Sequence, residues 1–155
     1  MAALAVMGGA GCTYLAPYPE RVLQTQWRDA ATRGDAQAQY ELGKSYCCGW
    51  GAGRTDARAV YWFCKAALQN HPLAQYELGR FFGARADTHA GLDLRQDLMF
   101  GYMWYSLAAL QEVHLAAAER EALARDMTAQ ELVQARKYLN DWQQFGCPKN
   151  EFWGF

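Results

Sequence analysis

The sequence predicts an all-α fold of stacked helix pairs, because it combines an internal repeat with a helix-favouring composition. A six-residue block, Ala-Gln-Tyr-Glu-Leu-Gly, occupies residues 38–43 and returns at residues 74–79, 36 positions later. A period between 20 and 50 residues indicates stacked repeats, since one such unit cannot bury its apolar face alone. Frequent Ala, Leu and Gln without long β-branched runs favour helix over sheet.

The chain has 155 residues, which suits one domain with a sizeable core. Its 15 basic and 16 acidic residues give a net charge of −1. A balanced charge provides no general attraction to a polyanion, so nucleic acid is not expected as a partner.

Residues 1–19 precede the predicted helices and partly resemble an export signal. Residues 1–10 are apolar and uncharged, and small residues lead directly to Cys12. This order resembles the lipobox of bacterial lipoproteins, which would make Cys12 a lipidated membrane anchor. The match is partial, because no basic residue precedes Arg21 and Gly9 stands where the lipobox prefers Leu. The alternative is an extended N-terminal segment.

The first repeat is predicted as two helices joined by a glycine-rich turn. A preceding helix over residues 20–33 ends at Gly34, and Asp35 can cap the next helix, over residues 36–47. Residues 48–55 contain three glycines and form the turn. The helix over residues 56–69 has an apolar face at helical spacing, made of Ala59, Trp62, Phe63, Ala66 and Ala67.

The second repeat is longer than the first. Its first helix covers residues 73–82, and residues 104–109 correspond to residues 62–67 at an offset of 42. The increase from 36 to 42 means that six residues have been inserted. We expect them in a polar loop within residues 84–97, which includes Arg85 and Asp87.

Two further helices and an aromatic segment complete the predicted organisation. A helix over residues 115–125 precedes a capping box formed by Thr128 and Glu131, whose helix extends to residue 143 and is polar, as a terminal repeat should be. We therefore expect about seven helices and three segments. These are an N-terminal signal-like or extended segment (1–19), a solenoid (20–143) and an aromatic C-terminal tail (144–155) that folds back or binds a partner.

The repeat unit resembles the Sel1-like repeat family, relatives of the tetratricopeptide repeat, over about residues 27–142. The first unit matches in order at Ala38, Leu42, Gly43, Tyr46, Gly49, Gly51, Ala59, Trp62, Lys65, Ala66 and Ala67, and the second at Ala74, Leu78, Gly79, Trp104, Ala108 and Ala109. The resemblance implies a right-handed α/α solenoid of antiparallel helix pairs. It also implies an adaptor or scaffold, which in bacteria is often periplasmic or associated with the outer membrane, and it implies no reaction.

Catalytic and ligand-binding patterns are weak in this sequence. The glycine-rich turn has Cys48 and Arg54 where a phosphate-binding loop needs Gly and Lys. The three histidines accompany no nucleophile motif, and the cysteines lack metal-ligand spacing. We expect no enzymatic activity, no metal and no cofactor.

The five cysteines leave two interpretations open. Cys47 and Cys64 should lie about 12 Å apart along antiparallel helices, beyond the roughly 7 Å between Cα atoms that a disulfide spans. Cys147 is the better partner for Cys47 or Cys48. The alternative is that all are thiols.

The candidate docking face lies on the first helix of each repeat. Gln39, Tyr40 and Lys44 recur as Gln75, Tyr76 and Arg80, so stacked repeats would align amides, phenols and cations. Glu41 and Glu77 recur as well, which marks structural or surface positions. The alternative is a plain solvated face with core-facing tyrosines.

The leading functional hypothesis is a non-enzymatic scaffold or adaptor of a bacterial envelope assembly. It would be periplasmic, or an outer-membrane lipoprotein anchored at Cys12, with a cytoplasmic location as the alternative. The partner protein would contact the groove, the insertion and an aromatic group comprising Phe152, Trp153 and Phe155. The second hypothesis is a regulatory subunit or peptide-binding modulator of an envelope enzyme.

Overall fold

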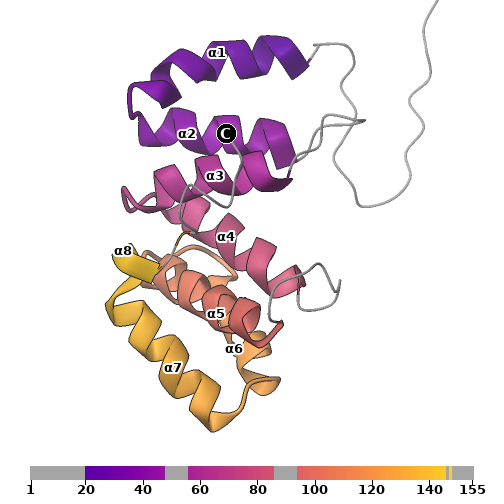
Figure 1. Ribbon diagram of the computed structural model, residues 1–155, viewed down its shortest axis with the longest axis vertical. Helices are drawn as coiled ribbons and strands as arrows, with labels where there is room; N and C mark the ends of the chain where they lie inside the picture. Colours follow the sequence, from indigo (N-terminus) through magenta and orange to yellow (C-terminus); the bar gives the residue numbers. More distant parts are fainter. Residues whose placement is uncertain (1–19, 48–55, 86–93, 146, 148–155) are drawn as a thin grey trace, which may run out of the picture.

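The helices stack one after another along the long axis of the molecule (Figure 1). The computed structural model describes residues 20–47, 56–85, 94–145 and 147, and within these ranges the regular elements are all helices. They are α1 (Glu20–Thr32), α2 (Ala36–Cys47), α3 (Asp56–Ala67), α4 (Pro72–Arg85), α5 (Leu94–Leu110), α6 (Ala116–Arg125), α7 (Ala129–Asn140) and α8 (Trp142–Phe145). The predicted all-α solenoid is confirmed. The predicted last helix is interrupted at Asp141, so the one-turn helix α8 is additional.

Each repeat is one helix pair, and the pairs pack on their neighbours in chain order. The first repeat is α2 with α3, and the second is α4 with α5, while α1 packs on α2 from the open end. At the other end both α6 and α7 pack on α5 (Figure 1). Buried side chains form a large cluster that extends from α1 to α5, and a smaller cluster of Leu98, Met127 and Ala135 lies where α5 meets the last helices.

A residue with a positive φ angle follows the helix end in each of the turns before α2, α4 and α6. These residues are Gly34, Asn70 and Glu112, with φ angles of 102°, 66° and 59°, and the last turn has a second such residue, Leu115. A left-handed residue after a helix lets the following N–H groups reach the last free carbonyls, which is the Schellman motif. The bonds that close these turns, each 3.1 Å long, run from the N–H groups of Asp35, His71 and Val113 to the carbonyls of Ala30, Ala66 and Ala108.

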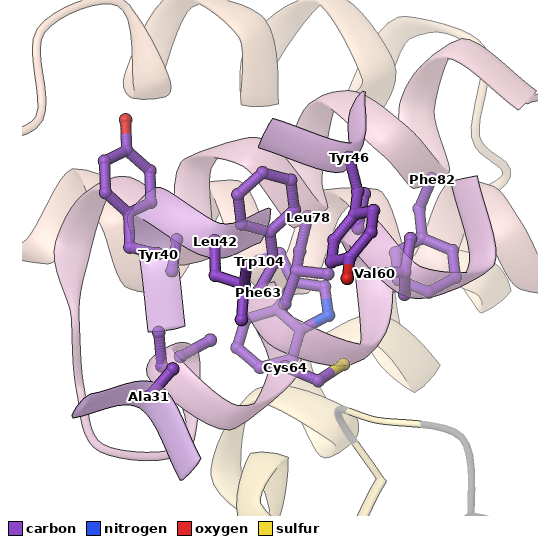
Figure 2. Packing of buried hydrophobic residues seen from close by; sticks show 14 of the residues in the cluster. Ala31, Tyr40, Leu42, Tyr46, Val60, Phe63, Cys64, Leu78, Phe82 and Trp104 are labelled. Carbon is purple, nitrogen blue, oxygen red and sulfur yellow. The ribbon is translucent and has the colours of Figure 1, made fainter. Parts of the chain in front are cut away.

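The core is built from residues at matching positions of the two repeats. Leu42 and Leu78, the leucines of the repeated block, are completely buried, and so is Trp104 of α5. Figure 2 shows these side chains packed together with Phe63 between the helices. The apolar stripes predicted from helical spacing therefore face one another.

The glycines of the repeated block allow the two helices of each pair to approach closely. A Cβ added at Gly43 would lie 2.6 Å from Phe63 Cδ1, and one added at Gly79 would lie 2.5 Å from Tyr105 Cδ1. Phe63 and Tyr105 are equivalent positions at the offset of 42. The same contact between a glycine and an aromatic ring thus closes both repeats.

The six inserted residues lengthen helices, and the prediction of a longer loop is wrong. The segments between the paired helices, 48–55 and 86–93, have equal lengths. Helix α4 ends two residues later than the position that corresponds to the end of α2. Helix α5 begins four residues earlier than the position that corresponds to the start of α3. Arg85 is therefore the last residue of α4, while Asp87 lies outside the described residues.

A disulfide joins Cys64 of α3 to Cys147, with 5.8 Å between their Cα atoms. The prediction that Cys147 pairs with Cys47 or Cys48 is wrong. The alternative, that the cysteines are all thiols, is wrong for Cys64 and Cys147. The return of the chain after α7 determines the pairing, because Trp142 of α8 packs edge-on against Trp104 at 6.0 Å and directs Cys147 toward α3. Cys47 Sγ lies 3.5 Å from the Lys44 carbonyl oxygen, and Cys12 and Cys48 lie outside the described residues.

The glycine contact predicts opposite effects for two substitutions in α4. Gly79→Ala should destabilise the fold by about 1–3 kcal/mol, because the added methyl overlaps the Tyr105 ring. Gly83→Ala is the matched control, since its Cβ would meet Leu123 at an ordinary 3.4 Å. It should be neutral or stabilise by up to about 1 kcal/mol, as alanine favours helix over glycine. Urea denaturation measures both, and equal effects of the two substitutions would contradict this account.

Candidate interaction surface

Two ion pairs recur at the same place on α2 and α4. Lys44 Nζ lies 3.1 Å from Glu41 Oε2, and Arg80 Nη1 lies 3.0 Å from Glu77 Oε2. In each pair the acidic residue precedes the basic residue by three positions, so both side chains lie on one face of the helix. Both cations are exposed, and we call the surface formed by these four residues the charged-pair face.

Aromatic rings pack beside the charged-pair face. The Lys44 ammonium lies 5.1 Å from the centroid of the Tyr40 ring, which itself stacks on His71 at 4.8 Å. The ring centroids of Tyr76 and Tyr105, which is on α5, are 5.6 Å apart. The tyrosines thus connect the charged residues to the core.

Charges on neighbouring helices affect the pKa of the tyrosines beside the charged-pair face. Burial raises the pKa of Tyr40; Lys44 opposes this shift, and Glu77, on the neighbouring α4, adds to it. Burial raises the pKa of Tyr105 as well, and Glu119 of α6 raises it further. Charged residues of one helix therefore act on tyrosines of the neighbouring helix.

The predicted docking glutamines are buried, and the prediction that they face outward is wrong. Gln39 and Gln75 are 4% and 0% exposed, and Tyr40 is also buried. Among the predicted residues, Lys44 and Arg80 are exposed and Tyr76 is half-buried. The physical reason is that these amides satisfy groups at the helix ends, which places them between repeats.

The two glutamines make the same contacts one repeat apart. Gln39 Nε2 donates to the Ala31 carbonyl at 3.0 Å, and its Oε1 accepts from Gln69 at 2.8 Å. Gln75 Nε2 donates to the Ala67 carbonyl at 3.4 Å, and its Oε1 accepts from Gln111 at 2.6 Å. Each amide therefore joins the end of the preceding helix to the end of the helix that completes its own repeat.

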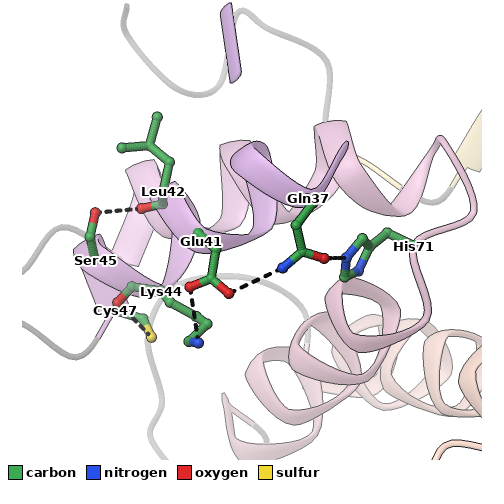
Figure 3. Close-up of polar contacts among 7 residues, drawn as sticks. All are labelled: Gln37, Glu41, Leu42, Lys44, Ser45, Cys47 and His71. Carbon is green, nitrogen blue, oxygen red and sulfur yellow. Dashed lines mark hydrogen bonds and ion pairs between the residues drawn. The ribbon is translucent and has the colours of Figure 1, made fainter. Parts of the chain in front are cut away.

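A second polar chain links α2 to the start of α4 (Figure 3). His71 Nδ1 accepts from the Ala74 N–H at 3.3 Å, so the other ring nitrogen, 2.9 Å from Gln37 Oε1, carries the proton. Gln37 donates in turn to Glu41 at 3.1 Å. Burial lowers the pKa of His71, which favours the neutral ring that this arrangement needs.

The structure does not describe the side chains of the remaining residues predicted for partner binding or lipidation. Arg85 ends α4, and nothing is described of its side chain. Five others lie outside the described residues: Cys12, Asp87, Phe152, Trp153 and Phe155. The acidic members of the charged-pair face, Glu41 and Glu77, were not among the predicted docking residues. Their spacing of three from each cation was the available signal.

The described residues show no arrangement suited to a metal, since they hold no group of three potential His, Cys, Asp or Glu ligands. Among the helices described above, none combines the length and apolar character of a membrane span. The arrangement that the structure does present is a repeated polar face on an aromatic support.

Paired helices in register, with matched side chains on the first helix of each pair, define a helical-repeat interaction protein. The Sel1 repeat family matches residues 36–71 and 72–113, which contain the pairs α2–α3 and α4–α5. The chain belongs to this family. Sel1 repeats generally mediate protein–protein interaction, and their proteins are typically non-enzymatic.

A similar protein is Protein SHC1 of Saccharomyces cerevisiae, which is 35% identical over 78 residues. The similar region covers 48% of this chain and spans 14% of the length of the yeast protein. No solved structure gives a significant match to the chain.

The buried amide of Gln75 yields a stability prediction. Gln75→Ala should cost about 1–3 kcal/mol, because it removes the shorter of the two hydrogen bonds that the Gln111 amide donates and the link to the Ala67 carbonyl. Gln130→Ala, at an exposed position of α7, is the control and should change stability by less than about 0.5 kcal/mol. Chemical denaturation compares the two variants. Equal small effects would show that the amide does not join the repeats.

Proposed function

We propose that this chain is a non-enzymatic scaffold or adaptor of a bacterial envelope assembly, and that a partner protein binds across the charged-pair face. The lengthened second repeat and the aromatic group Phe152, Trp153 and Phe155 provide further contacts in this proposal. The Sel1 family membership supports a protein as the partner.

The charged-pair face is the observation that carries the proposal. Exposed ion pairs at this spacing contribute only about 0.3–0.5 kcal/mol each to stability, so the fold does not depend on them. Each pair places one positive and one negative group together, which suits a partner with complementary charges and disfavours a polyanion.

The disulfide between Cys64 and Cys147 supports an exported location. Disulfides persist in oxidising compartments such as the periplasm and are rare in the cytosol of most organisms. A periplasmic location with lipidation at Cys12 agrees with this chemistry, and both remain part of the proposal.

Reversing the cations of the face should weaken partner binding. The variant Lys44→Glu with Arg80→Glu should recover at least about tenfold less partner in a pull-down, because each new carboxylate would repel its neighbour and the partner's acidic groups. The matched control is Arg136→Glu with Lys137→Glu, which changes the net charge equally at exposed positions of α7.

Circular dichroism should show both variants folded. The proposal fails if the α2–α4 variant recovers as much partner as the wild type, or if the α7 control loses as much. Recovery of an enzyme whose activity the chain changes would favour the modulator hypothesis over a structural scaffold.

The lipidation at Cys12 has its own test, by mass spectrometry of the protein purified from its native membrane fraction. We expect a mature chain that begins at Cys12 and carries the added mass of acyl chains. A chain that retains an unmodified Met1 would reject lipidation without affecting the interaction proposal.

A further inference from the structure

Four exposed leucines occupy matching positions at two neighbouring turns. Leu68 and Leu73 flank the turn between α3 and α4, and Leu110 and Leu115 flank the turn between α5 and α6. Their exposed fractions are 37%, 43%, 75% and 54%, whereas the leucines inside the repeats are buried. We call these four residues the leucine edge. At the first turn the equivalent positions are polar, Thr32 and Gln37.

The two turns of the leucine edge lie side by side. Gln111, which follows Leu110, donates to Asn70 Oδ1 at 3.3 Å. Its amide also donates to Gln75 Oε1 at 2.6 Å, and Gln75 lies two residues after Leu73. An extended peptide can therefore contact both turns at once.

The disulfide directs one particular segment to this edge. Cys147 is bonded to Cys64, and the Leu68 N–H donates to the Cys64 carbonyl at 2.9 Å, so Leu68 lies one helical turn from the anchor. Residues 148–155 follow and include Phe152, Trp153 and Phe155. Five extended residues reach about 17 Å, enough to bring Phe152 past Leu68 toward the second turn.

We propose that the aromatic segment, residues 148–155, lies along the leucine edge and that the disulfide holds it there. Its aromatic rings cover the solvent-exposed leucines. This contact is favourable because it removes apolar surface from water and because the short tether keeps the segment close to the edge.

A second copy of the chain fits this edge less well. A stable dimer buries about 800 Å² on each partner, mostly in a continuous patch. Four leucines at two turns offer much less, whereas an eight-residue segment anchored beside them is present at a high effective concentration.

This proposal does not rest on the charged-pair face, but it replaces one part of the proposed function, because rings that cover the leucine edge are not free to contact a partner. The segment binds the chain itself at the turns, whereas the charged-pair face is on the helices α2 and α4. The pull-down with reversed cations and the experiment below can therefore fail independently.

Photo-cross-linking tests the position of the segment. Trp153 is replaced by p-benzoylphenylalanine, and equal amounts of ¹⁴N- and ¹⁵N-labelled oxidised protein are mixed, irradiated and mapped by mass spectrometry. We expect cross-links within single molecules to peptides that contain Leu68, Leu73, Leu110 or Leu115. Cross-links between copies, cross-links to other surfaces or their absence would each overturn the proposal.

Limited proteolysis provides the second readout. Trypsin cleaves after Lys149, and the variant Leu68→Gln with Leu110→Gln should raise the rate of this cleavage about tenfold by releasing the segment. Val133→Gln is the control, because Val133 is 63% exposed on α7, away from both turns, and the rate should not change. Equal cleavage of the two variants and the wild type would overturn the proposal even if both variants fold normally.

Discussion

The buried glutamine amide between successive helix pairs is the constraint on which the stacking depends. A buried amide without partners costs about 1–3 kcal/mol, and Gln75 avoids this cost by bonding to the Ala67 carbonyl, Asn70 Oδ1 and the Gln111 amide. These partners lie at the ends of α3 and α5. The register of three helices is therefore coupled through one side chain, and Gln39 repeats the device one unit earlier.

Fixed register explains why surface features come in matched sets. Once α2 and α4 are placed by their glutamines, the residues two and five positions later fall at equivalent points and form the charged-pair face. The same register aligns the turns, where the left-handed residues Asn70 and Glu112 occupy equivalent positions. Each repeated surface is thus a consequence of packing in the interior and needs no separate stabilisation.

The repeat made the fold predictable, but it did not distinguish a buried polar residue from an exposed one. Gln39 and Gln75 recur with Lys44 and Arg80, yet the amides face helix ends and the cations face water, a difference set by tertiary contacts. Helical spacing had already indicated the burial of Leu42 and Leu78. The pairing of Cys147 required the position of α8, which depends on the contact of Trp142 with Trp104 and has no local sequence signal.

The differences between units then indicate where the molecule is specialised. The first turn carries Thr32 and Gln37, whereas the next two carry leucines, and the disulfide anchors residue 147 beside the first leucine of that series. The six added residues lengthen the helices of the second unit, which lies between those two turns. Packing requires neither the leucines nor the added length, because the first unit closes without them. The leucines therefore lie at the ends of the helices that the returning chain reaches, whereas the added length lies at the opposite ends of α4 and α5.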